Sequence, residues 1–374
     1  MILRKFQSLL GAALVLPLAG CIGFHSLPPP DYAAQADDGV LRVVFDERGD
    51  PWPVSADPAV AAVLPGDLDK SRAFRLAGKL DARGAAYDRV AVLDAAAARL
   101  ASDGPGRGGQ PGRGRVIVLI RGFNNSYDSF HAKYAQMRQW LGAQGAAPDV
   151  RYVEVYWDAL HRAGGRVAYP VALFTRSRGN AERAGACGLR DLLRRLPPGT
   201  DVTLLAHSLG AVVAMGAMAD VPPGRAAPVC DGRPAPDPVP AQLGDVRIAA
   251  FAPAVGAGLL EDDKGQVPPA LLGRLARFYV AFNPNDPAVT KRKLGINLPD
   301  TLGGDTRLGG NPDFVAQVDD RLAAAGLADG FQTLRFAHKA HELPTYLADT
   351  ARAKCLLWAA KVLPDPPPDC ALSR

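Results

Sequence analysis

The sequence predicts an α/β fold with a mostly parallel central sheet and helices on both faces of that sheet. From residue 116 onward, short runs of apolar β-type residues alternate with longer segments whose apolar residues recur at helical spacing. This alternation is typical of parallel βαβ units. The short runs are apolar at almost every position, as expected for strands buried on both faces. Residues 116–362 are therefore interpreted as one core domain.

Six apolar runs are expected to form the strands of this core. They are residues 116–120, 152–157, 202–205, 246–251, 278–282 and 333–336. The segments between them are expected to be helical, and three are well marked: residues 127–141, a segment ending at Leu196 before two prolines, and residues 210–218. A last helix is expected over residues 343–361, with Pro344 in its first turn.

The residues on either side of the core carry weaker signals. Residues 40–115 are interpreted as an N-terminal extension of the same sheet, with strands at 40–45 and 74–80 and a helix at 85–100. The Gly, Pro and Arg-rich stretch 103–115 is expected to be a loop. Residues 363–374 form a Pro-rich C-terminal tail.

The first twenty residues are typical of an export signal. Arg4 and Lys5 precede an apolar stretch over residues 9–18, which is too short for a comfortable membrane span. Leu18-Ala19-Gly20-Cys21 resembles the lipobox of bacterial lipoproteins, so Cys21 is the expected lipidation site and residues 21–39 a linker. The expected location is the cell envelope, on the periplasmic side of the outer membrane. The alternative is an ordinary cleaved signal with an incidental cysteine.

The four remaining cysteines are an even number in a chain that carries an export signal. They are Cys187, Cys230, Cys355 and Cys370, and two disulfides are expected among them. Of the three pairings, Cys355 with Cys370 is preferred because both lie near the C-terminus, joined by a stiff Pro-rich segment; buried free thiols are the alternative. No CxxC motif or Cys/His cluster indicates a metal, and no cofactor is expected.

The sharpest motif surrounds Ser208. An apolar strand runs directly into Ala206-His207-Ser208-Leu209-Gly210, and a helix of small residues follows at once. This context is typical of the nucleophile elbow of α/β hydrolases, where a tight turn lifts the serine above the sheet. Such a turn needs small residues two positions before and two after the serine; Gly210 satisfies this, and Ala206 replaces the usual first glycine.

A nucleophilic serine needs a histidine base and an acid that orients the base. In this fold their order along the chain is serine, acid, histidine. Asp286 follows the strand at 278–282 in a short turn and is the candidate acid; it is alternatively a turn cap, with Asp305 in reserve. His338 and His341 are the only downstream histidines, and His341 is favoured because it lies in the loop before the last helix.

An acyl-transfer site also needs donors for the developing oxyanion. The backbone N–H of Leu209, at the start of the helix after the serine, is one candidate. Phe123 N–H is the other, in the loop Arg121-Gly122-Phe123-Asn124-Asn125-Ser126 after the first core strand. The asparagines of this loop are expected to brace it or to cap the next helix. His207 is expected to point away from the serine as a packing residue.

Together these motifs resemble a bacterial α/β-hydrolase family of esterase-like and lipase-like proteins. That family typically has an HGFNNS-type loop, an AHSMG-type elbow, and an aspartate turn followed by an RLG element. The counterparts are residues 121–126, residues 206–210, Asp286 and Arg307-Leu308-Gly309. The resemblance runs from about residue 116 to 358 and implies the α/β-hydrolase fold with Ser208, Asp286 and His341 as the triad. Arg121 stands where the family usually has histidine.

The leading functional expectation is hydrolysis of a carboxylic ester at the cell envelope through an acyl-serine intermediate. The expected partners are a small-molecule or lipid-like ester and, through the N-terminal lipid, the membrane. The alternatives are acyl transfer and a non-catalytic binding protein with the same fold. Lysines and arginines number 43 against 38 acidic residues, an excess too small to indicate nucleic acid. The sequence does not indicate an oligomeric state.

Overall fold

A computed structural model describes the core of the chain together with one strand and one helix of the N-terminal extension. The described residues are 26, 39–51, 89–102, 114–147, 149–160, 171–218, 230, 236–237, 243–256, 277–290, 292–293, 296–297, 308–324, 326, 330–370 and 372. The expected strand at 74–80 and the expected signal peptide lie outside these residues.

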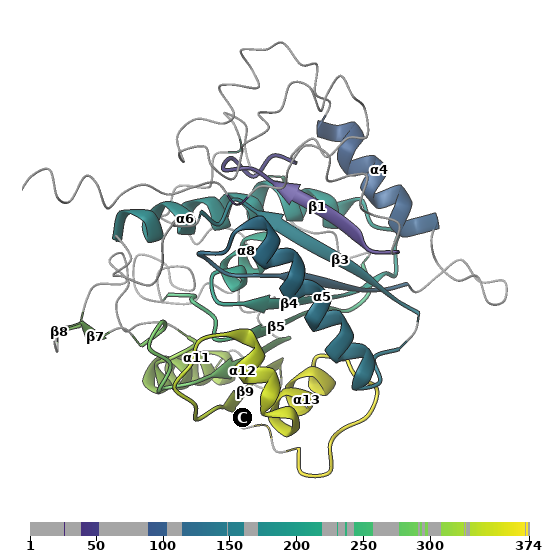
Figure 1. Cartoon of the computed structure of the whole chain (residues 1–374). Helices are drawn as coiled ribbons and strands as arrows, with labels where there is room; N and C mark the ends of the chain where they lie inside the picture. The colour runs from purple at the N-terminus through teal and green to yellow at the C-terminus, as the bar shows by residue number, and fades with distance from the viewer. Residues whose placement is uncertain are drawn as a thin grey trace, which may run out of the picture.

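The centre of the molecule is a seven-stranded sheet in which every pair of neighbouring strands is parallel (Figure 1). Its order is β1-β3-β2-β4-β5-β6-β9. The strands are β1 (Leu41–Phe45), β2 (Arg115–Ile120), β3 (Val150–Trp157), β4 (Asp201–His207), β5 (Val246–Phe251), β6 (Phe278–Phe282) and β9 (Phe331–Arg335). This confirms the predicted fold class. A two-residue hairpin, β7 (Arg292–Lys293) with β8 (Ile296–Asn297), lies outside the sheet.

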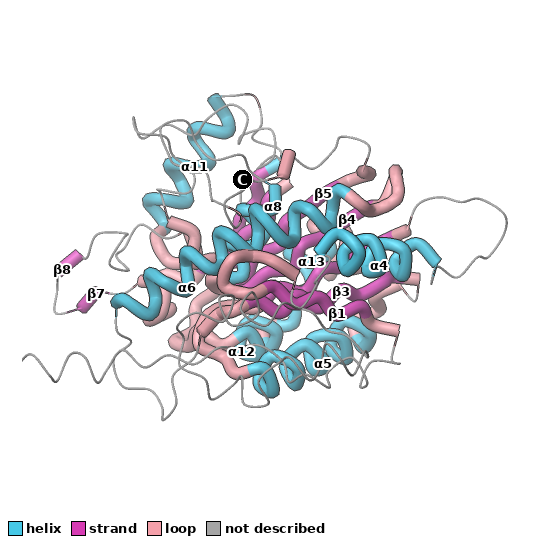
Figure 2. The backbone as a smooth tube through the Cα atoms, turned by 90° about the horizontal axis from the view of Figure 1, so that it is seen from above, coloured by secondary structure: helices cyan, strands magenta, loops and turns pink. Residues whose placement is uncertain are grey.

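Helices cover both faces of the sheet. In Figure 2, α4 (Arg89–Ser102), α6 (Val171–Arg183) and α8 (Gly210–Met218) lie on one side of the strands, and α5 (Tyr127–Ala143) and α12 (Leu343–Ala348) on the other. The remaining helices are the π-helical turn η2 (Ala184–Leu189), α7 (Arg190–Arg194), α11 (Pro312–Ala324) and α13 (Thr350–Ala359). None of the described helices combines the length and apolar character needed to cross a membrane.

The strand order places a topological switch point between β2 and β4. From β2 the chain passes through α5 to β3 on one side, whereas from β4 it passes through α8 to β5 on the other. Because parallel crossovers are right-handed, these two helices lie on opposite faces. The loops that leave β2 and β4 therefore diverge at the carboxyl ends of the strands, the edge at which open α/β sheets bind ligands.

The last helix differs from the expectation of one continuous helix over residues 343–361. It is divided into α12 and α13 at Asp349, whose ψ of 70° is not helical. Aspartate competes with the helical backbone for hydrogen bonds and favours cap positions over helix interiors, and its carboxylate accepts a hydrogen bond from Arg352, 2.6 Å away. The sequence reading also missed α11, whose buried face consists of Phe314, Val315, Val318 and Leu322.

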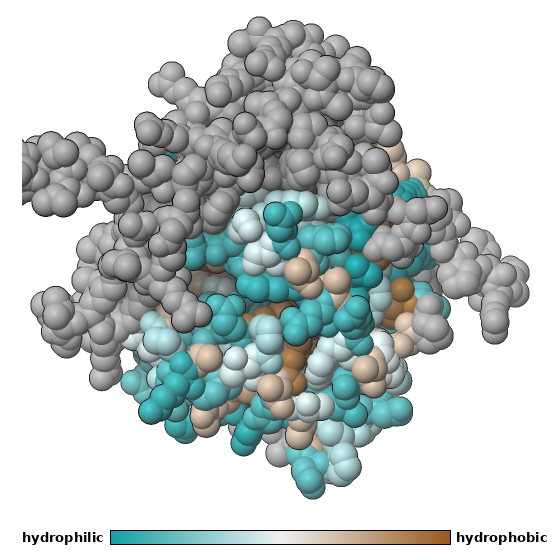
Figure 3. Space-filling view, in the orientation of Figure 1, coloured by the Kyte–Doolittle hydropathy of each residue, from teal (hydrophilic) through white to brown (hydrophobic). Residues whose placement is uncertain are grey.

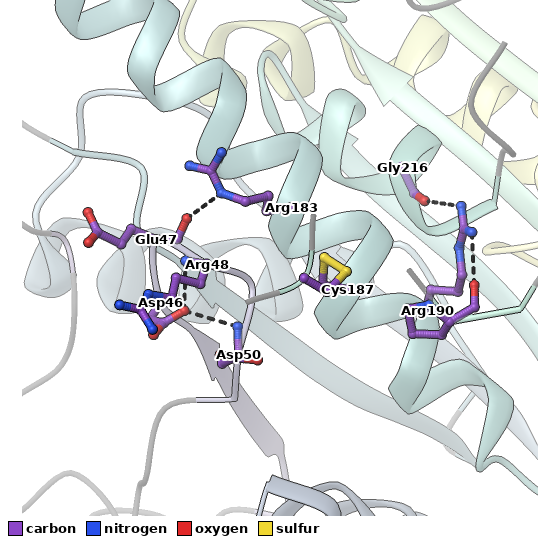
Figure 4. The surroundings of a disulfide bond; sticks show 10 residues. Asp46, Glu47, Arg48, Asp50, Arg183, Cys187, Arg190 and Gly216 are labelled. Carbon is purple, nitrogen blue, oxygen red and sulfur yellow. Dashed lines mark hydrogen bonds between the residues drawn. A yellow bond between two sulfur atoms is a disulfide. The ribbon is translucent and has the colours of Figure 1, made fainter. Parts of the chain in front are cut away.

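Two disulfides tie the described helices to other parts of the chain. Cys187 in η2 is bonded to Cys230, and Cys355 in α13 is bonded to Cys370, the preferred pairing. Figure 4 shows Cys187 with the turn that follows β1. In that turn Asp46 Oδ1 accepts from the backbone N–H groups of Arg48 and Asp50, and Arg183 donates to Glu47 O.

The described surface is mostly hydrophilic in the orientation of Figure 3, with a small hydrophobic area near the centre. Val90 in α4 is a large hydrophobic side chain that is exposed.

Candidate active site

Ser208 lies on a strained turn between β4 and α8. Its φ of 56° is in the left-handed region, which costs a non-glycine residue energy and is common at functional sites. Its backbone N–H donates to Phe251 O at 3.0 Å, so the turn is joined to the end of β5. A Cβ at Gly210 would lie 2.4 Å from Ile120 O. The turn therefore needs glycine at this position, as the elbow motif predicts.

Ser208, His341 and Asp286 form a continuous chain of hydrogen bonds. His341 Nε2 is 2.8 Å from Ser208 Oγ, and His341 Nδ1 is 2.8 Å from Asp286 Oδ2. Ser208 belongs to the elbow after β4, Asp286 to the turn after β6, and His341 to the loop between β9 and α12. Three segments that are far apart in the sequence thus meet at the carboxyl edge of the sheet.

The Asp286 carboxylate is fully buried and held from three sides. Oδ1 accepts from the backbone N–H of Ala288 at 2.9 Å. Oδ2 accepts from the Tyr346 hydroxyl at 2.8 Å in addition to His341. Burial, together with the charge of Asp286, raises the pKa of the Tyr346 hydroxyl far above its ordinary value. Tyr346 therefore stays protonated and keeps donating to the carboxylate.

His338 occupies a different position from His341. Its Nδ1 is 3.1 Å from Asn283 Nδ2, its backbone carbonyl accepts from the same amide, and its ring packs edge-on against Tyr346. No hydrogen bond joins the His338 side chain to Ser208 among the described residues. Asp305, the reserve acid, lies outside the described residues.

The loop after β2 lies directly against the serine. A Cβ at Gly122 would lie 2.6 Å from Ser208 Cβ and 3.1 Å from Ser208 Oγ, so only glycine permits this approach. Phe123 follows at once, and its ring packs edge-to-face on Phe174. Leu209, the other candidate donor, is fully buried between Ser208 and the first residue of α8. Both candidate donor residues are thus neighbours of the serine, one along the chain and one in the loop after β2.

Asn125 braces this loop. Its side-chain amide donates to the carbonyls of Gly122 and Phe123, and its Oδ1 accepts from Lys133, Ser129 and Arg121. Ser126 then caps α5 by accepting from the Ser129 N–H. The two interpretations of the asparagine-rich loop, a brace and a helix-capping turn, therefore hold at the same time.

Arg121 and His207 have roles that the sequence reading did not find. Arg121 is almost fully buried; its Nη2 donates to Asn125, and its guanidinium lies 5.6 Å from the centre of the Phe130 ring. Burial lowers the pKa of Arg121 to about 10, so it remains a cation at neutral pH. The His207 side chain contacts the loop before α12: its Nε2 lies 2.7 Å from the backbone carbonyl of His341.

Ser208, His341 and Asp286 have the arrangement expected of a nucleophile, a base and an orienting acid. No group of three or more His, Cys, Asp or Glu side chains among the described residues has the geometry of a metal site. The hydrogen-bonded serine, histidine and aspartate can support nucleophilic catalysis by an activated serine hydroxyl.

Comparison with known proteins agrees with the fold. Residues 110–227, which include the loop after β2 and the elbow, match the model of a family described as "Alpha/beta hydrolase of unknown function (DUF900)". The chain therefore has the α/β-hydrolase fold, with a family match over residues 110–227. No curated protein matches this hydrolase-fold chain.

Solved structures of two esterases are similar to it at low identity. Esterase PE8 is 16% identical, with 68% of this chain and 94% of the esterase covered, at a TM-score of 0.36. Esterase 2 of Thermogutta terrifontis is 13% identical, with 69% and 88% covered, at a TM-score of 0.37.

Proposed function

We propose that this α/β hydrolase is an envelope-anchored serine hydrolase that cleaves carboxylic esters through an acyl-serine intermediate. The observation that carries the proposal is the pair of 2.8 Å contacts that place His341 between Ser208 Oγ and Asp286 Oδ2. A base must lie within hydrogen-bonding reach of the proton that it removes, and a distance of 2.8 Å meets this requirement.

The reaction follows from these positions. Ser208 Oγ attacks the acyl carbon of the ester while its proton passes to His341 Nε2, and the carbonyl electrons move onto oxygen. The N–H groups of Phe123 and Leu209 stabilise this oxyanion. When the carbon–oxygen bond to the alcohol breaks, His341 returns the proton to the leaving oxygen. Water, activated in turn by His341, then hydrolyses the acyl-serine to a carboxylic acid and free Ser208.

Asp286 keeps His341 in the productive state. By accepting from His341 Nδ1 it holds that proton in place, so that Nε2 faces Ser208 with a lone pair. The same carboxylate stabilises the imidazolium that forms when the serine proton is taken up.

Fluorophosphonate labelling and turnover of p-nitrophenyl esters of increasing acyl length test the proposal together. Wild type should be labelled and active, and Ser208→Ala should be neither. His341→Ala should be nearly as inactive, while His338→Ala, a matched histidine that does not contact the serine, should retain most of its activity. If His338→Ala abolishes turnover and His341→Ala does not, the assignment of the base is wrong. If Ser208→Ala is labelled like wild type, Ser208 is not the nucleophile; if wild type is neither labelled nor active, the chain is a binding protein rather than a serine hydrolase.

The envelope part of the proposal depends on Cys21. The charged start, the short apolar stretch and Leu-Ala-Gly-Cys support lipidation there. Five residues later the Ser26 backbone N–H donates to Asp158 Oδ1 at 3.1 Å, at the carboxyl end of β3. Five residues span at most about 18 Å. A lipid on Cys21 would therefore keep the carboxyl edge of the sheet, where the candidate site lies, near the membrane. This position suits an ester presented at the membrane surface.

Fractionation of cells tests the anchor. Wild type should sediment with membranes and carry lipid on Cys21 by mass spectrometry, and Cys21→Ser should be released. Turnover of a soluble p-nitrophenyl ester should be equal in the two forms. Membrane association of Cys21→Ser, with no lipid on wild type, would contradict the anchor without affecting the proposed chemistry.

A further inference from the structure

The His207 side chain touches the base in two ways. Its Nε2 lies 2.7 Å from the carbonyl oxygen of His341, and its ring is 4.8 Å from the His341 ring, at an angle of 42°. Because the carbonyl can only accept, His207 must carry its proton on Nε2. The neutral ring then has a lone pair on Nδ1. Nδ1 is buried and has no hydrogen-bond partner among the described residues.

Within the described part of the chain, Arg121 has buried donors that lack a partner, as His207 has a buried acceptor that lacks one. Its Nε and Nη1 are also buried without a partner among the described residues, and both are donors. Ile120 pairs with Ala206 in the register of β2 and β4, so Arg121, the first residue after β2, comes beside His207, the last residue of β4. Residues at equivalent positions of parallel strands point to the same face of the sheet. The unpartnered donors and the unpartnered acceptor therefore lie on the same side.

A small cavity lies beside these two residues. Arg121 and His207 both line it, with Tyr134, Phe251 and Leu343 among its other walls, and its volume is about 10 Å³. This is close to the smallest volume that holds one water molecule, and a buried water normally needs two to four polar partners. A water here would accept from the guanidinium and donate to His207 Nδ1. Leaving such buried donors and acceptors unpaired would destabilise the folded protein.

We propose that His207 is a positioning residue for the reaction, held by one buried water that joins it to Arg121, and that it fixes the backbone of His341 against Ser208. The inference rests on the proposed function, because His341 has to be held only if it is the base. Arg121 is then the fixed end of a path that runs through the water and the His207 ring to the His341 carbonyl. Buried groups thereby connect the loop after β2, which contains the candidate donor Phe123, to His341.

His207 must remain neutral for this role. A charged ring 4.8 Å from His341 would oppose formation of the His341 imidazolium. Burial holds the pKa of His207 well below its usual range, and the charges of His341, Arg121 and Lys133, which face it, act in the same direction. Only the hydrogen bond to the His341 carbonyl acts in the opposite direction. The ring therefore donates from Nε2 throughout the neutral pH range.

Two substitutions at His207 separate positioning from packing. Glutamine can place an N–H donor near the His341 carbonyl, whereas phenylalanine keeps a ring and loses the donor. Under the proposal, kcat for a p-nitrophenyl ester falls about tenfold in His207→Phe with KM unchanged, and by much less in His207→Gln. A packing role predicts the reverse order, because phenylalanine fills the buried volume better. Thermal unfolding of both variants checks that they are folded.

A double-mutant cycle tests the bridge to Arg121. Arg121→Met should lower kcat, and part of this loss should disappear when His207→Phe is already present, because both changes break one path; the part due to the lost Arg121–Asn125 hydrogen bond should remain. Arg121→His, which retains a donor, should recover part of the loss. Multiplied losses in the double variant would show that the two residues act separately and would overturn the bridge.

Nitrogen NMR of histidine-labelled wild-type protein tests the inference without relying on activity. His207 should be in the Nε2–H form from pH 5 to pH 8, with Nδ1 accepting a hydrogen bond. An Nδ1–H form, or a titration in this range, would refute the positioning role. If no ester is turned over and no fluorophosphonate label is taken up, the proposed function fails, while this NMR result still reports on the His207 site.

Discussion

Replacing Asp286 with asparagine should reverse the direction of the hydrogen bond at His341 Nδ1. The Ala288 N–H donates to Asp286 Oδ1, so the amide oxygen of asparagine must take that place. The amide nitrogen then replaces Oδ2 and faces His341 Nδ1 and the Tyr346 hydroxyl. Tyrosine can turn its hydroxyl to accept, but His341 Nδ1 can accept only by giving up its proton. The ring proton then sits on Nε2, aimed at Ser208 Oγ, and His341 cannot act as a base.

The size of the effect follows from this change of tautomer. The corresponding substitution in serine proteases lowers kcat by about 10⁴ with the geometry intact, which equals about 5.4 kcal/mol at 1.36 kcal/mol per tenfold change. Since asparagine has the shape of aspartate, we expect a loss of about 10³ to 10⁴ in kcat here. Tyr346→Phe removes only one of the three hydrogen bonds to the Asp286 carboxylate. This matched control should lose only about tenfold, the effect of one charge-assisted hydrogen bond.

The assay is the steady-state turnover of p-nitrophenyl acetate, with the rate of fluorophosphonate labelling as a second measure. Both rates should fall in parallel, because both need the serine to be deprotonated. Retention of more than about one hundredth of the wild-type kcat by Asp286→Asn, with an unchanged melting temperature, would refute Asp286 as the orienting acid. A loss as severe in Tyr346→Phe would instead show that Tyr346 takes part directly.

Three further predictions concern the loop after β2, a buried acid and a disulfide. Gly122→Ala should lower kcat by about 10² because the new Cβ would lie 2.6 Å from Ser208 Cβ. Gly142→Ala, where a Cβ meets nothing within 4 Å, should be silent, and equal activity of the two variants would contradict the close approach. Burial and then the Asp50 charge raise the pKa of Asp46 from 3.8 to about 7. Between pH 3.8 and about 7, folding is therefore accompanied by uptake of a proton at Asp46. The stability that the folded state gains from this protonation is lost as the pH rises through about 7. Asp46→Asn should raise the free energy of unfolding at pH 8 by at most about 4 kcal/mol, at 1.36 kcal/mol per pKa unit, and change it little at pH 4; denaturant unfolding that shows no pH-dependent difference would argue against a protonated Asp46. Cys355→Ser with Cys370→Ser opens a loop of 15 residues and should lower the free energy of unfolding by about 3 kcal/mol; four alkylatable thiols in unreduced wild type would exclude both disulfides.

Much of the sheet could be predicted because its strands are buried on both faces. Residues 116–120 are continuously apolar and residues 202–205 are apolar except at Thr203, and the structure extends each strand by only one to three residues, to Arg115–Ile120 and Asp201–His207. The candidate site depends on strand ends, so it could be located once the strands were identified. Ser208 follows β4 and Asp286 follows β6 within a short turn, which brings both residues to the same edge.

Local sequence patterns could not predict other features of the structure. The division at Asp349 depends on whether one helix or two pack better against the sheet, and periodicity over residues 343–361 is compatible with either. The contact of His207 with His341 could not be predicted, because the partner atom is a backbone carbonyl oxygen 134 residues away. Backbone acceptors leave no signal in a sequence. Arg121 was noticed only as a departure from the histidine of a similar family.

The position of His341 raises a physical problem that the neighbouring side chains resolve. In the sheet, β9 is three strand positions from β4, about 14 Å. The loop from Arg335 to His341 must therefore run back across the strand ends. Such a loop needs partners for its backbone groups along the way. Phe336 N–H donates to Phe282 O at the end of β6, the Asn283 amide donates to His338 O, and His207 donates to His341 O at the end of β4. His338 is therefore near the site because it lies on this path, and the path ends where the His207 ring holds the base over Ser208.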